Sequence, residues 1–124
     1  MAIFKDDLKI GHMVAGADLS AELNKFVKVS ADDTVVLVAA ATDLVAGVNE
    51  RNDGGNGKAI TINRGVMLKV VAGGTVNAGD EVASANGTAI AASSGNVVHG
   101  ICSKGGAAGE LIEVIAELNA YVKA

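Results

Sequence analysis

Residues 29–48 read VSADDTVVLVAAATDLVAGV, and residues 82–101, VASANGTAIAASSGNVVHGI, match them without a gap. Four residues that recur are Val29, Ala39, Val45 and Gly47, which return as Val82, Ala92, Val98 and Gly100. In this alignment the turn at Asp32 and Asp33 falls on Ala85 and Asn86. Each copy holds short apolar, β-branched runs bounded by turn residues, and that pattern favours buried strands over helices.

A shorter match lies upstream of each copy. Residues 14–17 read VAGA and residues 71–74 read VAGG, and the second copy is a few residues shorter overall. The sequence therefore predicts two copies of one strand–turn–strand–loop–strand unit. The alternative is a chance resemblance between two segments that are rich in alanine and valine.

The remaining segments add strand and turn signals. Residues 58–63, KAITIN, alternate with period two, so Ile60 and Ile62 are expected to face a core. Gly65–Val71 is predicted to be another strand, and residues 49–57, NERNDGGNG, are predicted to be an exposed loop. The pair Asn86-Gly87 is the strongest hairpin signal, because a type I′ turn needs positive φ at both positions.

Two segments leave helix and strand open. Asp18–Lys25 is compatible with one or two helical turns capped by Asp18. Glu110–Val122 has apolar residues at helical spacing, so the pattern alone favours a helix, whereas the β context narrowly favours a strand at Leu111–Ala116. We predict a mainly β chain: a small single-domain β-barrel or sandwich-like fold with an internal repeat and at most one or two short helices. Residues 1–13 are predicted to form an N-terminal arm and residues 14–124 the β-rich domain.

Composition excludes several classes of protein. Of 124 residues, 50% are hydrophobic, 2% aromatic and 19% charged, which is too apolar for intrinsic disorder. The longest apolar run, residues 35–41, is too short to span a bilayer, and the mixed start MAIFKDDLK does not read as a secretory signal. A net charge of −4 without a basic stripe argues against nucleic-acid binding. We therefore expect neither a membrane nor a nucleic-acid partner.

The inventory of reactive side chains is small. His99 and Cys102 have the spacing of two metal ligands, but a structural zinc site needs four ligands and a catalytic one needs three and a water. We expect no metal, no cofactor and no catalytic residue, so the chain is not predicted to be an enzyme. The competing hydrolytic hypothesis would require a site built from His12, His99 and carboxylates.

A set of segments in fixed order resembles the head decoration proteins of tailed bacteriophages, also called capsid cement proteins. These segments are Asp18-Leu-Ser, Phe26-Val-Lys-Val-Ser, residues 42–48, residues 70–82, residues 85–89 and residues 109–114. The resemblance covers roughly residues 14–116. It implies a small β-rich fold, a homotrimer, and a virion protein on the outer capsid surface that is made in the host cytoplasm. Its implied partners are the major capsid protein and itself, and its implied role is to stabilise the expanded capsid by bridging neighbouring capsomers.

The physical reading agrees with self-association. A core with so few aromatic residues buries less apolar area per position, and oligomerisation would offset this deficit. Exposed strand edges also invite β-augmentation by another chain. We predict that the arm contacts the capsid or a neighbouring subunit, with the contact residues Ala2, Ile3, Phe4, Leu8 and Ile10.

One alternative comes from residues 76–82, VNAGDEV, which look like the hammerhead turn of biotinyl and lipoyl carrier domains. In those domains the modified lysine sits in a tight hairpin between apolar residues, and no lysine here has that setting. A carrier module or a small-ligand-binding β-barrel is therefore the second hypothesis.

Overall fold

The computed structural model describes residues 9–52 and 55–124, and within them every regular element is a β-strand. The first five strands are β1 (Lys9–Ala15), β2 (Phe26–Ala31), β3 (Thr34–Leu37), β4 (Gly47–Asn52) and β5 (Ala59–Asn63). The next five are β6 (Met67–Val71), β7 (Glu81–Ala85), β8 (Thr88–Ala91), β9 (Val97–Lys104) and β10 (Leu111–Val122). The predicted β-rich fold with an internal repeat is confirmed. No helix in the described part of the chain is long and apolar enough to cross a membrane.

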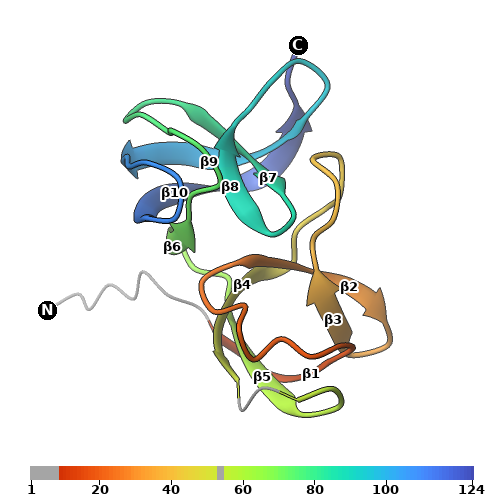
Figure 1. Cartoon of the computed structure of the whole chain (residues 1–124). Helices are drawn as coiled ribbons and strands as arrows, with labels where there is room; N and C mark the ends of the chain where they lie inside the picture. The colour runs from red at the N-terminus through yellow and green to blue at the C-terminus, as the bar shows by residue number, and fades with distance from the viewer. Residues whose placement is uncertain (1–8, 53–54) are drawn as a thin grey trace, which may run out of the picture.

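The strands form two units that lie one above the other in Figure 1. Strands β1 to β5 close into a barrel in the order β1-β3-β2-β4-β5. Strands β6 to β10 form a five-stranded sheet in the order β6-β10-β9-β7-β8. We call strands β1 to β5 the barrel and strands β6 to β10 the sheet.

The barrel and the sheet have the same topology. In the barrel β2 pairs with β3 and β4, β4 pairs with β5, and β5 pairs with β1, all antiparallel. In the sheet β7 pairs with β8 and β9, β9 pairs with β10, and β10 pairs with β6 in the same way. The parallel pair β1–β3 closes the barrel, and its counterpart in the sheet is the single parallel bridge Ala72↔Ala89. The sheet is therefore a second copy of the barrel that stays open along one seam.

Hydrogen bonds at the seam repeat from one unit to the other. The N–H of Gly16 donates to the carbonyl of Val35 at 2.8 Å, and the N–H of Gly73 donates to the carbonyl of Ala89 at 2.8 Å. Likewise the N–H of Gly57 donates to Ala15, and that of Gly109 donates to Ala72, both at 2.8 Å. Gly57 and Gly109 also share a positive φ, 81° and 88°. The duplicated unit thus has five strands and includes the upstream VAG matches.

The structure corrects the ungapped alignment within the first hairpin. Val27 pairs with Gly47 and Val82 pairs with Gly100, so Val82 corresponds to Val27 and not to Val29. The turn Asp32-Asp33 corresponds to Asn86-Gly87 and not to Ala85-Asn86. A two-residue shift preserves the alternation of a strand, which explains why the alternation of valines could not reveal the error. The predicted hairpin turn itself is confirmed, with φ of 51° at Asn86 and 82° at Gly87.

The structure corrects one further local prediction and decides the two segments for which the sequence left helix and strand open. The predicted loop 49–57 is wrong at its start, because β4 continues to Asn52 and pairs with β5. Asn49 is buried there, and its Nδ2 donates to the carbonyl of Glu22 at 3.1 Å, which satisfies the donor side of the buried amide. Residues 18–25 form turns, since the Asp18 carboxylate accepts the N–H of Ser20 at 3.0 Å. Residues 111–122 form strand β10, so the β context decides that segment.

The core consists of two apolar clusters, of which one lies within the barrel and one is shared by the two units. One lies inside the barrel and contains Ile60 and Ile62, as predicted from their alternation. The other joins the units, because Phe26, Val38 and Val48 from the barrel chain pack with the apolar interior of the sheet. The Phe26 ring lies 5.8 Å from the His99 ring, centroid to centroid. The barrel therefore covers one end of the sheet's core.

Candidate interaction surfaces

The predicted contact residues of the arm are placed only in part. Ala2, Ile3, Phe4 and Leu8 lie outside the described residues. Ile10 lies in β1, where it pairs with Ile62 and packs half-buried against the barrel core. Residues 9–13 of the predicted arm thus belong to a barrel strand.

The reactive side chains named from the sequence lie apart. His12 is exposed on β1, with its Nε2 3.3 Å from Asp33 Oδ1, whereas His99 is buried on β9 in the sheet. Cys102 is also buried on β9, and burial raises the pKa of its thiol. Among residues 9–52 and 55–124 there is no group of three or more His, Cys, Asp or Glu side chains that could hold a metal ion. The structure does not bring the two histidines into one site.

His99 is a buried imidazole at the junction of the two units. Burial lowers its pKa, a hydrogen bond with the backbone of Asp43 raises it, and the charge of Arg64 lowers it further, with a net decrease. Its Nε2 has no hydrogen-bond partner within the described residues. A cavity of about 170 Å³ beside it is lined by residues of both units, among them Phe26 and Glu117. A neutral imidazole with no acid–base partner fits a structural role at this junction.

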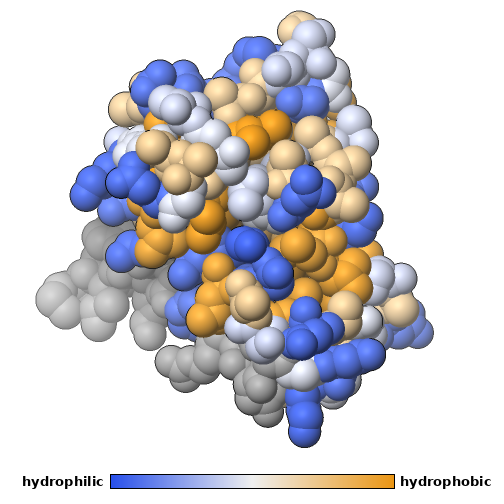
Figure 2. All heavy atoms as spheres, in the orientation of Figure 1, coloured by the Kyte–Doolittle hydropathy of each residue, from blue (hydrophilic) through white to orange (hydrophobic). Residues whose placement is uncertain are grey.

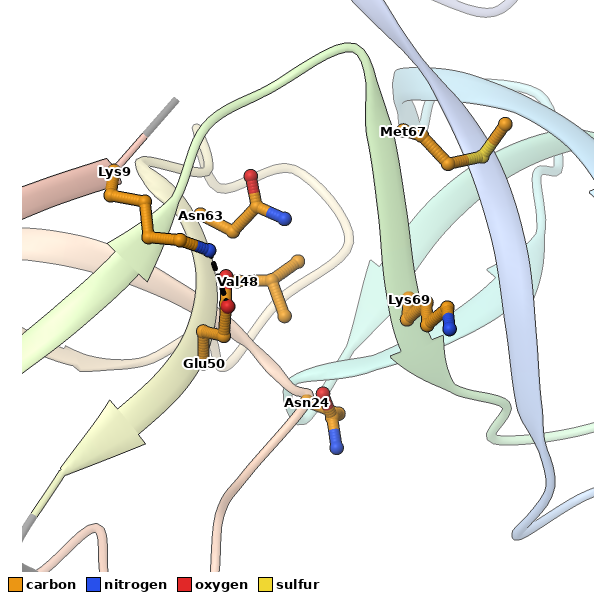
Figure 3. Close-up of a pocket in the computed structure, with 7 residues that line it drawn as sticks. All are labelled: Lys9, Asn24, Val48, Glu50, Asn63, Met67 and Lys69. Carbon is orange, nitrogen blue, oxygen red and sulfur yellow. Dashed lines mark hydrogen bonds and ion pairs between the residues drawn. The ribbon is translucent and has the colours of Figure 1, made fainter. Parts of the chain in front are cut away.

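A larger groove runs between the barrel and strand β6. It encloses about 370 Å³ and is lined by Lys9, Asn24, Val48, Glu50, Asn63, Met67 and Lys69. Figure 3 shows the Lys9 ammonium meeting the Glu50 carboxylate, with Met67 and Lys69 on β6. We call the groove lined by these seven residues the β6 groove. On the face shown in Figure 2, apolar atoms flank a hydrophilic group at the level where the two units meet.

The β6 groove can accept an extended polypeptide. Strand β6 is an edge strand that pairs only with β10 among the described strands. On its other side the N–H of Val71 donates to the carbonyl of Asn24 at 2.8 Å, while Met67 to Lys69 have no strand beside them in the described structure. An unpaired strand edge is a template for β-augmentation, and the groove beside it carries the Lys9–Glu50 ion pair and the Lys69 cation. The groove has the features of a peptide-binding site.

A second surface is the outer face of the sheet, made by Met67, Lys69 and Val71 of β6, Leu111, Glu113 and Ile115 of β10, and Ile101 of β9. Ile115 pairs with Met67 on one side and Ile101 on the other, and Leu111 pairs with Val71. Leu111, Ile115 and Ile101 are 53%, 49% and 44% exposed. Sequence reasoning missed this face, although the run LIEVI at residues 111–115 places apolar residues on both faces of a strand.

The two-residue turns β2–β3 and β7–β8, Asp32-Asp33 and Asn86-Gly87, contain no lysine, whereas Lys58 lies in the loop that joins β4 to β5. The VNAGDEV segment instead leads into β7, with the Asp80 carboxylate accepting the N–H of Asn77 at 2.9 Å.

Comparison with known proteins identifies a structural relative. No model of a known protein family matches the sequence, and no curated protein sequence matches it either. Among solved structures, the head fiber gp8.5 N base of bacteriophage phi29 superposes with a TM-score of 0.70 at 19% sequence identity. The superposition covers 90% of this chain and 94% of that one. The chain therefore shares the fold of a phage head fiber base over nearly its whole length.

Proposed function

We propose that this chain is a structural virion protein that binds the outer surface of an expanded phage capsid and bridges neighbouring capsomers as a homotrimer. The observation that supports this most strongly is the fold shared with the phi29 head fiber base across 90% of the chain. The ordered sequence segments that resemble capsid decoration proteins point to the same class of function.

In this proposal the β6 groove receives an extended segment of the major capsid protein. The segment adds to the free edge of β6 by main-chain hydrogen bonds. Main-chain pairing supplies affinity with little demand on sequence. Residues 2–8, which precede Lys9 at the groove, are proposed to extend the contact along the capsid or onto a neighbouring subunit.

The test is co-sedimentation of the purified protein with expanded capsids that lack it. Lys9→Glu replaces the Lys9–Glu50 ion pair in the groove by two carboxylates, and Lys58→Glu makes the same charge change at an exposed barrel residue outside it. We expect wild-type and Lys58→Glu proteins to bind, and Lys9→Glu to bind on the order of tenfold more weakly. Absence of binding by the wild-type protein would contradict the proposed function, and equal binding by both variants would contradict the assigned groove.

A truncation tests the terminal segment separately. Because β1 begins at Lys9, the deletion is confined to residues 2–8 and leaves the barrel strands in place. Weaker capsid binding by the folded, truncated protein supports the extended contact, and unchanged binding removes it.

A further inference from the structure

We propose that a second copy of this chain packs on the outer face of the sheet, with Leu111, Ile115 and Ile101 at the centre of the contact. This inference refines the homotrimer in the proposed function and rests on that part of it. Three features of the described residues support it. The two duplicated units carry different residues at equivalent exposed positions, the equivalent face of the barrel is buried by the sheet, and two opposite charges lie within the apolar surface.

The duplicated barrel works as an internal control for the sheet. Hydrogen bonds place Lys58 in the barrel opposite Ala15 and Glu110 in the sheet opposite Ala72, so β5 and β10 align residue by residue. On that alignment Leu111 replaces Ala59 and Ile115 replaces Asn63. The same strand pairing therefore forms with a small and a polar residue at these positions. The exposed leucine and isoleucine are not required by the fold, which indicates that they serve a contact.

The barrel also shows what covers an apolar residue on this face. Val48 pairs with Asn63 in the barrel as Ile101 pairs with Ile115 in the sheet, so Val48 and Ile101 are equivalent. Val48 is 2% exposed because the sheet packs on it within the cluster shared by the two units. Ile101, at the same position of the second unit, is 44% exposed. Among residues 9–52 and 55–124 the first unit has a neighbour on this face and the second has none, and a further copy of the chain would supply it.

The charges on the face favour a copy of this chain over an unrelated partner. Lys69 and Glu113 are direct cross-strand partners between the Met67–Ile115 row and the Val71–Leu111 row. In the described structure neither side chain forms an ion pair. Around a three-fold axis a patch with one cation and one anion inside an apolar area can meet the same patch of both other copies, with Lys69 of each copy facing Glu113 of the next. The partner is therefore assigned as a second copy.

The first experiment measures mass in solution by sedimentation equilibrium, without any capsid. The double variant Leu111→Ala/Ile115→Asn gives the sheet the residues that the barrel carries, so it should fold. The control Val29→Asn changes an exposed valine of the barrel, 56% exposed, in the same way. We expect the wild-type protein and the control to self-associate at about 0.1 mM, and the double variant to dissociate at least about tenfold more readily. A monomeric wild-type protein at this concentration, or equal association of the double variant, overturns the inference.

A charge exchange tests the orientation of the contact. Lys69→Glu and Glu113→Lys each place like charges opposite one another between copies, and the double exchange restores opposite charges. We expect each single variant to associate more weakly and the double variant to recover. No recovery by the double variant contradicts the assigned Lys69–Glu113 contact. Because these measurements need no capsid, a failure here is distinct from a failure of capsid binding.

Discussion

Gly47 and Gly100 are equivalent glycines where a neighbouring strand approaches too closely for any side chain. An added Cβ at Gly100 would lie 2.3 Å from the carbonyl oxygen of Ile115 and 2.7 Å from Cγ1 of Val114. At Gly47 it would lie 2.4 Å from Cγ2 of Ile62 and 2.6 Å from the carbonyl oxygen of Asn63. Comfortable contacts are about 3.5 Å, so alanine at either position must move the adjacent strand by roughly 1 Å. We predict that Gly100→Ala and Gly47→Ala each destabilise the fold.

The free energy of unfolding should fall by about 1–3 kcal/mol for each variant, which is the usual cost of overpacking a core. For a chain of this size that corresponds to a fall in Tm of about 4–12 °C, or to a urea midpoint lower by about 1 M at unchanged slope. The matched control is Gly11→Ala, because a Cβ at Gly11 meets nothing within 4 Å. That variant should be neutral or slightly stabilising, since alanine restricts the unfolded chain.

The assay is urea unfolding followed by far-UV circular dichroism, with thermal melts of the same proteins. Similar losses in Gly47→Ala and Gly100→Ala, with none in Gly11→Ala, support the close strand approach in both units. Melting of Gly47→Ala and Gly100→Ala within about 1 °C of wild type, or an equal loss in Gly11→Ala, would contradict the close strand approach.

Four further predictions follow from the junction and the turns. Phe26→Ala empties a fully buried site between the units and should cost about 3–5 kcal/mol in urea unfolding, whereas a loss below about 1 kcal/mol would argue against a shared core. The Ala40 N–H and the Lys28 ammonium hold the pKa of Asp43 at about 2. The ionised Asp43 carboxylate therefore stabilises the fold fully above about pH 4, and this stabilisation is lost as the pH falls toward 2. The free energy of unfolding, measured in urea across this range, should depend less on pH in Asp43→Ala. Burial lowers the pKa of His99, so the unfolded chain binds a proton more readily than the folded one once the pH falls below the unfolded pKa of about 6.5. Acidification from pH 7 to pH 5 should therefore destabilise the wild type more than His99→Gln, as measured by urea unfolding at the two pH values. The buried Cys102 thiol should react with a disulfide reagent only after unfolding, and fast labelling of the native protein would contradict its burial.

The class of fold and its duplication follow from local patterns in the amino-acid sequence. The Asn86-Gly87 turn and the alternation around Ile60 and Ile62 are local signals, since turn geometry and strand periodicity depend on neighbouring residues alone. They were sufficient to predict a mainly β chain with a repeated unit, and to predict Ile60 and Ile62 as core residues.

Which strand faces are covered depends on long-range packing between the strands. Residues 111–122 have a helical spacing of apolar residues, and pairing with β6 and β9 makes them a strand. Val48 and Ile101 occupy equivalent positions, yet one is buried and the other exposed, because only the barrel has a neighbouring unit on that face. The β6 groove likewise exists only where the two units meet. Burial and edge accessibility depend on contacts between segments far apart in the chain, and local patterns do not encode those contacts.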